Sequence, residues 1–479
     1  MLPRSLAPES DRRSSPAVTL AVLCLAAGAY SVLSSAVIPA LPTIRADLHA
    51  SETGVTWLLT GFLLSASVGT AIIGKLGDMY GKQRLLVWTL LVLTAGTLLA
   101  ALSGSLVVLI VARVIQGVAG GIFPLSFGIA RDEFPPDRVA GSIGLMSAIL
   151  GVGGGFGLVL GGVIDEHLTW HWLFWIPLVA LALAAVCTWR FIPESKVRSP
   201  GKINWLAATL LTVGMSSLLI GIAQTTAWGW TGPRTLVLLG VGVLTCAAWI
   251  LVELRSSNPL IDMAMMRVRG VWTVNLAAFL VGGGLYAWFL LLPQFAQLPR
   301  STGFGYGASV VVAGLYLLPC AVGMGVLGSV AGRVERRFSS RSALIAGAAI
   351  SAVACGWLTI TSRHPYDMLV SSTLLGIGIG LAFAALGNLI VQAVPANQTG
   401  AASGMNTVLR TLGGAVGGQI AATFVVGGTT GGLPALTGFT KTFAMAALVL
   451  TGCAIAALLI PPRDSLLSPI PSVVPSETV

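Results

Sequence analysis

The stretch GKLGDMYGKQR, from Gly74 to Arg84, lies between two long apolar runs of the chain. It is short and charged, and it carries a glycine near each end. Small residues let two hydrophobic helices approach closely, and a cluster of cations holds a loop on one side of a bilayer. We therefore predict that residues 74–84 form a tight loop between two membrane-spanning helices.

The rest of the chain has the composition of a membrane protein. Of its 479 residues, 55% are hydrophobic and only 9% are charged, whereas soluble domains carry about 25% charged residues. About 20 apolar residues span the hydrocarbon as a helix, and an open sheet would leave backbone groups unpaired there. We predict an all-α polytopic membrane protein with fourteen transmembrane helices, at about 16–41, 52–74, 85–103, 106–130, 140–163, 171–193, 203–224, 234–254, 270–293, 307–330, 342–361, 367–391, 400–426 and 438–460.

The net charge of +10 does not indicate a nucleic-acid partner, because the cations follow the membrane topology. Lys and Arg are concentrated in alternate connections, on the side that includes the 74–84 loop. By the positive-inside rule this side is cytoplasmic, and it also holds both predicted tails, 1–15 and 461–479. We expect a multi-pass protein of the plasma membrane with both termini in the cytoplasm and with the lipid bilayer as its surroundings.

The chain also contains an internal repeat. At one constant offset, residues of the fourth and fifth apolar runs recur in the twelfth and thirteenth: Gly117, Gly121, Gly141 and Met146 correspond to Gly376, Gly380, Gly400 and Met405. The segment GRVERRF, from Gly332 to Phe338, repeats the 74–84 pattern one residue out of register. We predict two related six-helix bundles, 16–193 and 270–460, separated by an inserted two-helix segment, 194–269.

These features resemble the major facilitator superfamily, whose first-loop motif reads G-x-L-A-D-R-x-G-R-K. The matching residues are Gly74, Leu76, Asp78, Gly81 and Lys82, whereas Met79 and Gln83 replace two cations of the motif. The 6+2+6 arrangement looks like the 14-helix drug:proton antiporter branch. The resemblance implies bundles that rock about a site near mid-membrane. It also implies that Asp78 meets a helix N-terminus or an arginine across the interface and latches one conformation, while Lys82 and Arg84 anchor the topology.

Two arginines lie inside predicted spans. Arg113, Gln116 and Gly117 resemble the superfamily pattern R-x-x-Q-G and share one helix face. An arginine at the bilayer centre costs about 2.5–3.5 kcal/mol on insertion scales, so it needs a wet cavity or a partner. In the functional interpretation Arg113 tunes a nearby proton-binding group or contacts substrate; in the structural one it bonds to a neighbouring helix. Arg410 is the second interior cation, with a predicted role in the cavity.

The fifth apolar run contains GVGGGFGLVLGG. Four of its glycines match the exporters' fifth-helix motif G-x-x-x-G-P-x-x-G-G, namely Gly153, Gly157, Gly161 and Gly162. In similar proteins this motif accompanies antiport, although Leu158 stands at its proline. The same spacing predicts close packing of another helix on a flat glycine surface, and the two interpretations are compatible.

A binding cavity for an amphipathic solute needs aromatic walls with scattered polar groups. Several runs supply such residues, and the candidates are Tyr30, Ser34, Trp57, Thr60, Asn275, Tyr286, Trp288, Tyr316, Asn388, Asn406 and Arg410. Each is also compatible with a role as an interface anchor or in an interhelical hydrogen bond. With Arg113 and Arg410 as its charges, such a cavity suits a neutral, weakly polar or anionic organic molecule.

The resemblance implies a secondary carrier. Many similar exporters have an aspartate in the first helix, at a place that falls at about Leu33, and no Asp or Glu of this chain lies clearly at mid-membrane. We predict a monomer that exports hydrophobic small molecules by proton antiport, with the proton gradient as energy source and no cofactor. The alternative is a carrier for one metabolite, with uptake possible. The absence of a catalytic cluster, metal-ligand set or nucleotide-binding motif argues against an enzyme or an ATP-driven pump.

Overall fold

The structure, a computed structural model, describes residues 15–195, 197–199, 201–362, 364–427, 429–430 and 433–462. Almost all of both predicted tails lies outside these residues. Within them, fourteen helices are long and apolar enough to cross a membrane. The prediction of a polytopic helical protein with fourteen spans is therefore confirmed.

The N-terminal bundle contains six spans, the fourth of which is interrupted by a short 3-10 turn. They are α1 (Pro16–Ala36), α3 (Glu52–Tyr80), α4 (Lys82–Ala101), α5 (Leu106–Val118) with η1 (Ala119–Gly121) and α6 (Ile122–Glu133), α7 (Pro136–His167) and α8 (Trp172–Phe191). A short helix, α2 (Leu41–Asp47), precedes α3.

The C-terminal bundle also contains six spans. They are α13 (Arg269–Gln297), α14 (Val310–Phe338), α15 (Ser340–Ile360), α16 (Pro365–Gln392), α17 (Thr399–Gly427) and α18 (Leu436–Ala457). Two short 3-10 helices, η2 (Arg300–Thr302) and η3 (Ala396–Gln398), lie in its connections. Strands β1 (Thr429–Thr430) and β2 (Leu433–Pro434) pair in antiparallel fashion between α17 and α18.

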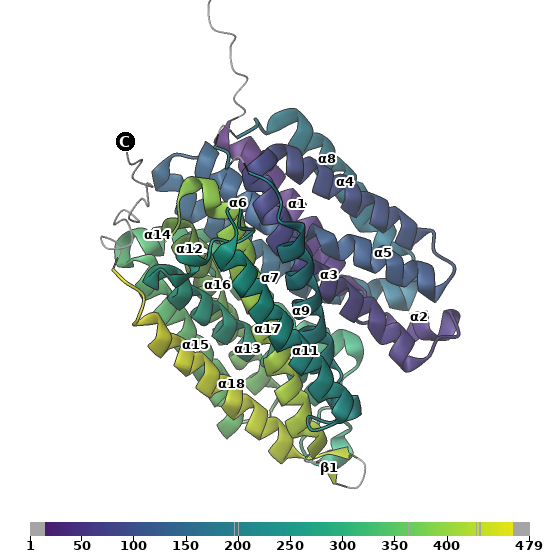
Figure 1. The fold of residues 1–479 in the computed structure, drawn as a ribbon. Coiled ribbons are helices and arrows are strands. Elements are labelled where there is room, and N and C mark those ends of the chain that lie inside the picture. Colours follow the sequence, from purple (N-terminus) through teal and green to yellow (C-terminus); the bar gives the residue numbers. More distant parts are fainter. Residues whose placement is uncertain are drawn as a thin grey trace, which may run out of the picture.

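The inserted segment forms its own helical hairpin beside the seam between the bundles. It consists of α9 (Trp205–Ala223), α10 (Thr225–Trp228), α11 (Pro233–Arg255) and α12 (Met263–Arg267). Helices α9 and α11 pack closely because Gly214 faces Cys246 and Gly242 faces Leu218. Helix α9 also contacts α3 of the first bundle and α17 of the second (Figure 1).

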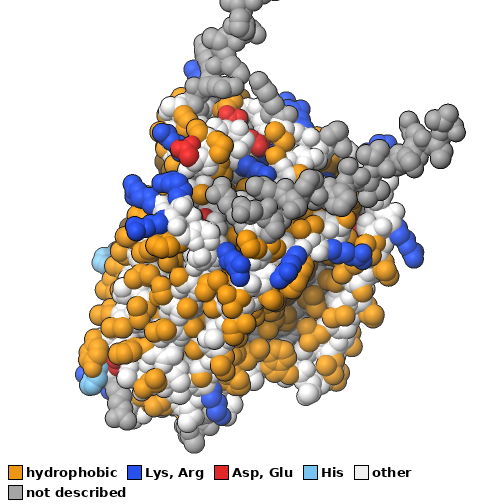
Figure 2. All heavy atoms as spheres, turned by 90° about the vertical axis from the view of Figure 1, so that its left-hand side faces the viewer, with side chains coloured by type: hydrophobic (Ala, Val, Ile, Leu, Met, Phe, Trp, Pro, Cys, Tyr) orange, Lys and Arg blue, Asp and Glu red, His pale blue; other side chains and the backbone are white. Residues whose placement is uncertain are grey.

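The outer surface is that of a membrane protein. Large apolar side chains are exposed on the outside of the helices, for example Trp88 on α4 and Leu244 on α11. Figure 2 shows hydrophobic side chains over most of one side of the molecule, with most Lys and Arg side chains toward its upper end. Such a surface is stable in lipid, where exposed apolar area carries no hydrophobic penalty.

The connection between α3 and α4 is shorter than predicted. Residues 74–84 do not form a loop, because α3 continues to Tyr80 and α4 begins at Lys82. Gly81 alone turns the chain, with a φ of 112° that strains any residue with a side chain. The carboxylate of Glu194 lies where a Cβ of residue 81 would be, and it accepts a hydrogen bond from the backbone N–H of Arg84.

Candidate functional site

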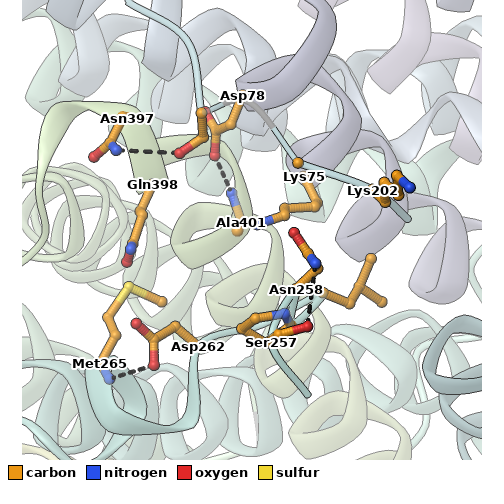
Figure 3. Close-up of a pocket in the computed structure, with 14 residues that line it drawn as sticks. Lys75, Asp78, Lys202, Ser257, Asn258, Asp262, Met265, Asn397, Gln398 and Ala401 are labelled. Carbon is orange, nitrogen blue, oxygen red and sulfur yellow. Dashed lines mark hydrogen bonds between the residues drawn. The ribbon is translucent and has the colours of Figure 1, made fainter. Parts of the chain in front are cut away.

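Asp78 connects the two bundles at one face of the membrane. It lies in the last turn of α3 and is 1% exposed. Its Oδ1 accepts a hydrogen bond from the N–H of Gly400 (3.1 Å). Its Oδ2 accepts one from the N–H of Ala401 (3.0 Å), which Figure 3 shows. Both donors lie in the first turn of α17. A carboxylate at a helix N-terminus gains about 0.3–1 kcal/mol. We call this side of the molecule, where α3 ends and α17 begins, the Asp78 face.

Glycines bring the backbones of the two bundles into contact at the same face. A Cβ added to Gly74 on α3 would collide with the carbonyl oxygen of Gly400 on α17. A Cβ added to Gly332 on α14 would collide with the backbone of Gly141 on α7. In the internal repeat, Gly74 corresponds to Gly332 and Gly141 corresponds to Gly400. The first contact joins Gly74 to Gly400 and the second joins Gly332 to Gly141, so the repeat relates the two contacts to each other.

Further polar contacts cross the interface on this face. The amide nitrogen of Asn388 on α16 donates to the carboxylate of Glu335 (2.9 Å) and to the carbonyl of Ala140 on α7 (3.1 Å). Arg131 on α6 donates to the hydroxyl of Thr399 at 2.8 Å. The Asp78 face is closed in this structure.

Lys82 supports Asp78 from within the first bundle. Its side chain is 0% exposed, and its Nζ lies 2.6 Å from Oδ2 of Asp132 and 3.9 Å from Oδ1 of Asp78. The hydroxyl of Ser195 also donates to Asp132. The ammonium group of Lys82 is thus buried in an ion pair, and the role of Lys82 as a topology anchor stays a prediction. The Arg84 side chain is exposed, as a topology anchor would be.

Removing the Lys82 charge is expected to destabilise the protein. Loss of one partner of a buried ion pair costs about 3–5 kcal/mol, because the other charge is left without compensation. Lys82→Gln should therefore lower the melting temperature of the detergent-purified protein by several degrees. Arg84→Gln removes an exposed charge two residues away and should leave it nearly unchanged. Equal melting temperatures for the two variants would contradict this prediction.

Arg113 is held by the backbone of its own bundle. It is 0% exposed and donates to the carbonyls of Leu58 (3.1 Å), Leu33 (3.3 Å) and Ser34 (3.5 Å) and to Oε1 of Gln116 (3.0 Å). Its guanidinium also lies 4.2 Å from the ring centroid of Phe62. These contacts agree with the structural interpretation, in which Arg113 bonds to neighbouring helices. In this conformation the Arg113 side chain is not exposed.

The glycine motifs in α5 and α7 pack helices closely. A Cβ at Gly117 on α5 would collide with the Phe62 carbonyl on α3. Gly153, Gly157 and Gly161 bring α7 onto Ser31, Val32 and Ala36 of α1, and Gly162 turns toward Val311 of α14. These contacts match the packing interpretation of the motif.

Aromatic residues of the first bundle pack around Tyr30, and one tyrosine of the second bundle lies near it. The Tyr30 ring stacks on Phe62 with centroids 5.9 Å apart and contacts Phe123 edge-on at 6.2 Å. From the second bundle, Tyr286 lies within electrostatic reach of both Tyr30 and Arg410. Tyr286 is 43% exposed although its ring faces Gly414 of α17, so it borders accessible space between the bundles.

Other predicted cavity residues lie elsewhere. Trp288 is completely buried and donates to Ser371 at 3.0 Å, and Asn275 and Asn406 bond to each other at 3.0 Å. Asn388 belongs to the closed Asp78 face. The prediction that these four residues line a cavity is wrong for this conformation, because all four are buried between helices and form interhelical hydrogen bonds there. Four more are half-buried on α1, α3 and α14, namely Ser34, Trp57, Thr60 and Tyr316.

The structure also brings together residues that sequence reasoning missed. A pocket of about 220 Å³ beside Asp78 is lined by both bundles and by both connections of the inserted hairpin, including Lys75, Ser199, Lys202, Asn258 and Gln398 (Figure 3). Ser199 links the bundles here, since its N–H donates to the Asp78 carbonyl and its hydroxyl accepts from Asn397. No local pattern marks these residues, because the pocket forms from four segments distant in sequence.

Two six-helix bundles that pack against each other and meet closely at one membrane face are the architecture of secondary carriers. A sequence model of the Major Facilitator Superfamily matches residues 23–418, so the chain belongs to this superfamily. The prediction of the superfamily and of its 14-helix exporter branch is confirmed.

Known relatives extend over most of the chain. It is 31% identical to the tetracenomycin C resistance and export protein of Streptomyces glaucescens, over 86% of this chain and 76% of that protein. It is 32% identical to the cephamycin export protein of Amycolatopsis lactamdurans, over 88% and 87%. The fold is similar to that of the human organic anion transporter MFSD10, with a TM-score of 0.68, 16% identity, and coverage of 93% of this chain and 100% of that one.

Proposed function

We propose that the protein exports hydrophobic small molecules, such as drugs, antibiotics or the producing cell's own metabolites, by alternating access with proton entry as the driving force. The contacts at the Asp78 face carry this proposal, because packed glycines and a few polar bonds can separate as rigid bundles rock. Two relatives are named for antibiotic export or resistance, and they support transport out of the cell. Proton antiport is proposed from the exporter branch of the superfamily.

The proposal places the Asp78 face in the cytoplasm. Many cations lie on this face, among them Lys75, Arg84, Arg138, Arg336 and Arg341, and the positive-inside rule assigns such a face to the cytoplasm. The structure then corresponds to a carrier closed toward the cytoplasm, in a plasma membrane, with both termini inside. Both bundles belong to one chain, so a monomer supplies the complete pathway.

A susceptibility assay tests this function. Expression in a bacterium without its major efflux pumps is expected to raise resistance to several hydrophobic compounds, and an uncoupler should abolish the effect. An Asp137→Asn variant, which alters an exposed acid on the same face, serves as the control and should behave like the wild type. Saturable uptake of one compound, with no change in susceptibility, would contradict export and support a dedicated metabolite carrier.

A further inference from the structure

The two interior arginines have opposite surroundings. Arg113 is fully buried, and three backbone carbonyls and Gln116 accept its hydrogen bonds. Arg410 is only half-buried, and it makes no hydrogen bond or ion pair with any residue in the described part of the chain. A guanidinium has five N–H donors and needs acceptors in a medium of low polarity. Arg113 finds them inside the protein, and Arg410 is left with its donors free.

Two aromatic residues of the second bundle lie near Arg410. Its guanidinium carbon lies 4.6 Å from the ring centroid of Phe383 on α16, in a cation–π contact. Tyr286 on α13 is within electrostatic reach and borders the space between the bundles, with Tyr30 of the first bundle near it. Arg410 itself lies near the middle of the span that ends with α17, which runs from Ala396 to Gly427. The free cation therefore faces the central part of the pathway.

Two acids near the interface, Asp78 and Glu335, are already engaged elsewhere. Asp78 accepts bonds from the first turn of α17, and Glu335 accepts from Asn388 and Ser340. Both lie on the Asp78 face, whereas Arg410 lies about two to three turns farther along α17 than Gly400, which is about 15 Å at the helical rise of about 1.5 Å per residue. At this depth a charge is weakly screened, so an anion that reaches Arg410 gains a strong, charge-assisted hydrogen bond.

We propose that Arg410 recognises the negative group of an aromatic organic anion, a carboxylate, phenolate or sulfonate, while the buried Phe383 ring supports the guanidinium from behind and the exposed Tyr286 contacts the rings of the anion. This inference rests on the proposed transport function and narrows its substrate class. Arg410 is then a specificity-determining residue. The guanidinium fork can hold two oxygens of a carboxylate or sulfonate at once, or donate both N–H groups to the single oxygen of a phenolate, and a neutral analogue with the same rings offers no such acceptor.

A pair of fluorescent probes tests the charge preference directly. 1-Anilinonaphthalene-8-sulfonate and N-phenyl-1-naphthylamine share one ring system and differ by the sulfonate group. We expect purified wild-type protein to bind the sulfonate more tightly than the neutral amine. Arg410→Gln should weaken binding of the sulfonate at least 10-fold and change that of the amine less than twofold, and Arg410→Lys should restore part of the sulfonate affinity.

The control removes a positive charge without touching the proposed site. Lys441→Gln alters an exposed cation on α18 of the same bundle and should leave both affinities at wild-type values. Equal binding of the two probes by the wild type, no binding of either, or a parallel loss of both in Arg410→Gln would overturn the proposal. These outcomes are separable from failure of the proposed function, because probe binding is measured on purified protein and export is measured in cells.

Discussion

Gly74→Ala is expected to reduce transport to a small fraction of the wild-type rate, although alanine is the better helix former. Closing the Asp78 face presses Gly74 of α3 against the carbonyl of Gly400, and no space remains there for a methyl group. Overpacking of this kind costs about 1–3 kcal/mol, which shifts a two-state equilibrium about 5- to 150-fold. The variant should therefore remain open at the Asp78 face. Export in cells and the rate of cysteine labelling at Ser403→Cys, a buried position on α17, measure the two effects.

Gly418→Ala on α17 is the matched control, because no atom lies within 4 Å of a Cβ at that position. It should transport at the wild-type rate and should be slightly more stable, since alanine favours a helix by about 0.8–1 kcal/mol over glycine. The internal repeat adds a second test, because Gly332→Ala should have the same effect as Gly74→Ala at the contact with Gly141. Normal transport by both variants would contradict the role of these contacts in closure.

Asp78→Asn is expected to lower transport about 10-fold or more while the protein remains folded. The carboxylate accepts from two backbone N–H groups of α17, whereas an asparagine offers one oxygen and turns its amino group toward the other N–H. Hydrogen bonds to charged groups contribute about 1.5–3 kcal/mol. The state closed at the Asp78 face should therefore lose most of its free-energy advantage over the open state. Labelling of a cysteine at Ser403 should become faster, and export should fall.

The exposed acid Asp137 provides the comparison for this variant. Asp137→Asn removes a charge from the same face, and the hydrogen bond that Asp137 accepts from Arg336 goes to its backbone carbonyl and not to its side chain. Unchanged labelling and export in Asp78→Asn would show that the carboxylate is not a latch. Loss of export with unchanged labelling would instead place the defect in a step other than closure.

Much of the fold was predictable from local sequence. Long apolar runs specify spans because lipid provides no partners for an unpaired backbone, and the internal repeat predicted two bundles with an inserted pair. The 74–84 motif indicated the superfamily and the position of Asp78. The prediction of a loop there was wrong. Hydropathy shows only where charged residues begin in the sequence, and α3 continues as a helix beyond its first charged residues because its end packs into the interface between the bundles.

The candidate site depended on tertiary structure. Sequence reasoning treated Arg113 and Arg410 as similar interior cations. Only the folded chain shows that backbone carbonyls accept hydrogen bonds from Arg113, whereas Arg410 has a cation–π contact and no hydrogen bond within the described ranges. Lys82 and Asn388 likewise acquired their partners, Asp132 and Glu335, from segments 50 and 53 residues away.

The amino-acid sequence by itself determined the membrane environment, the number of spans and the two-fold repeat, because these follow from short-range hydropathy and from internal similarity. Which donors meet which acceptors was decided only when α3, α7, α14 and α17 packed, since such pairings depend on the separation of side chains in space. That separation is also what leaves the Arg410 guanidinium without a hydrogen-bond acceptor among the residues that the structure describes.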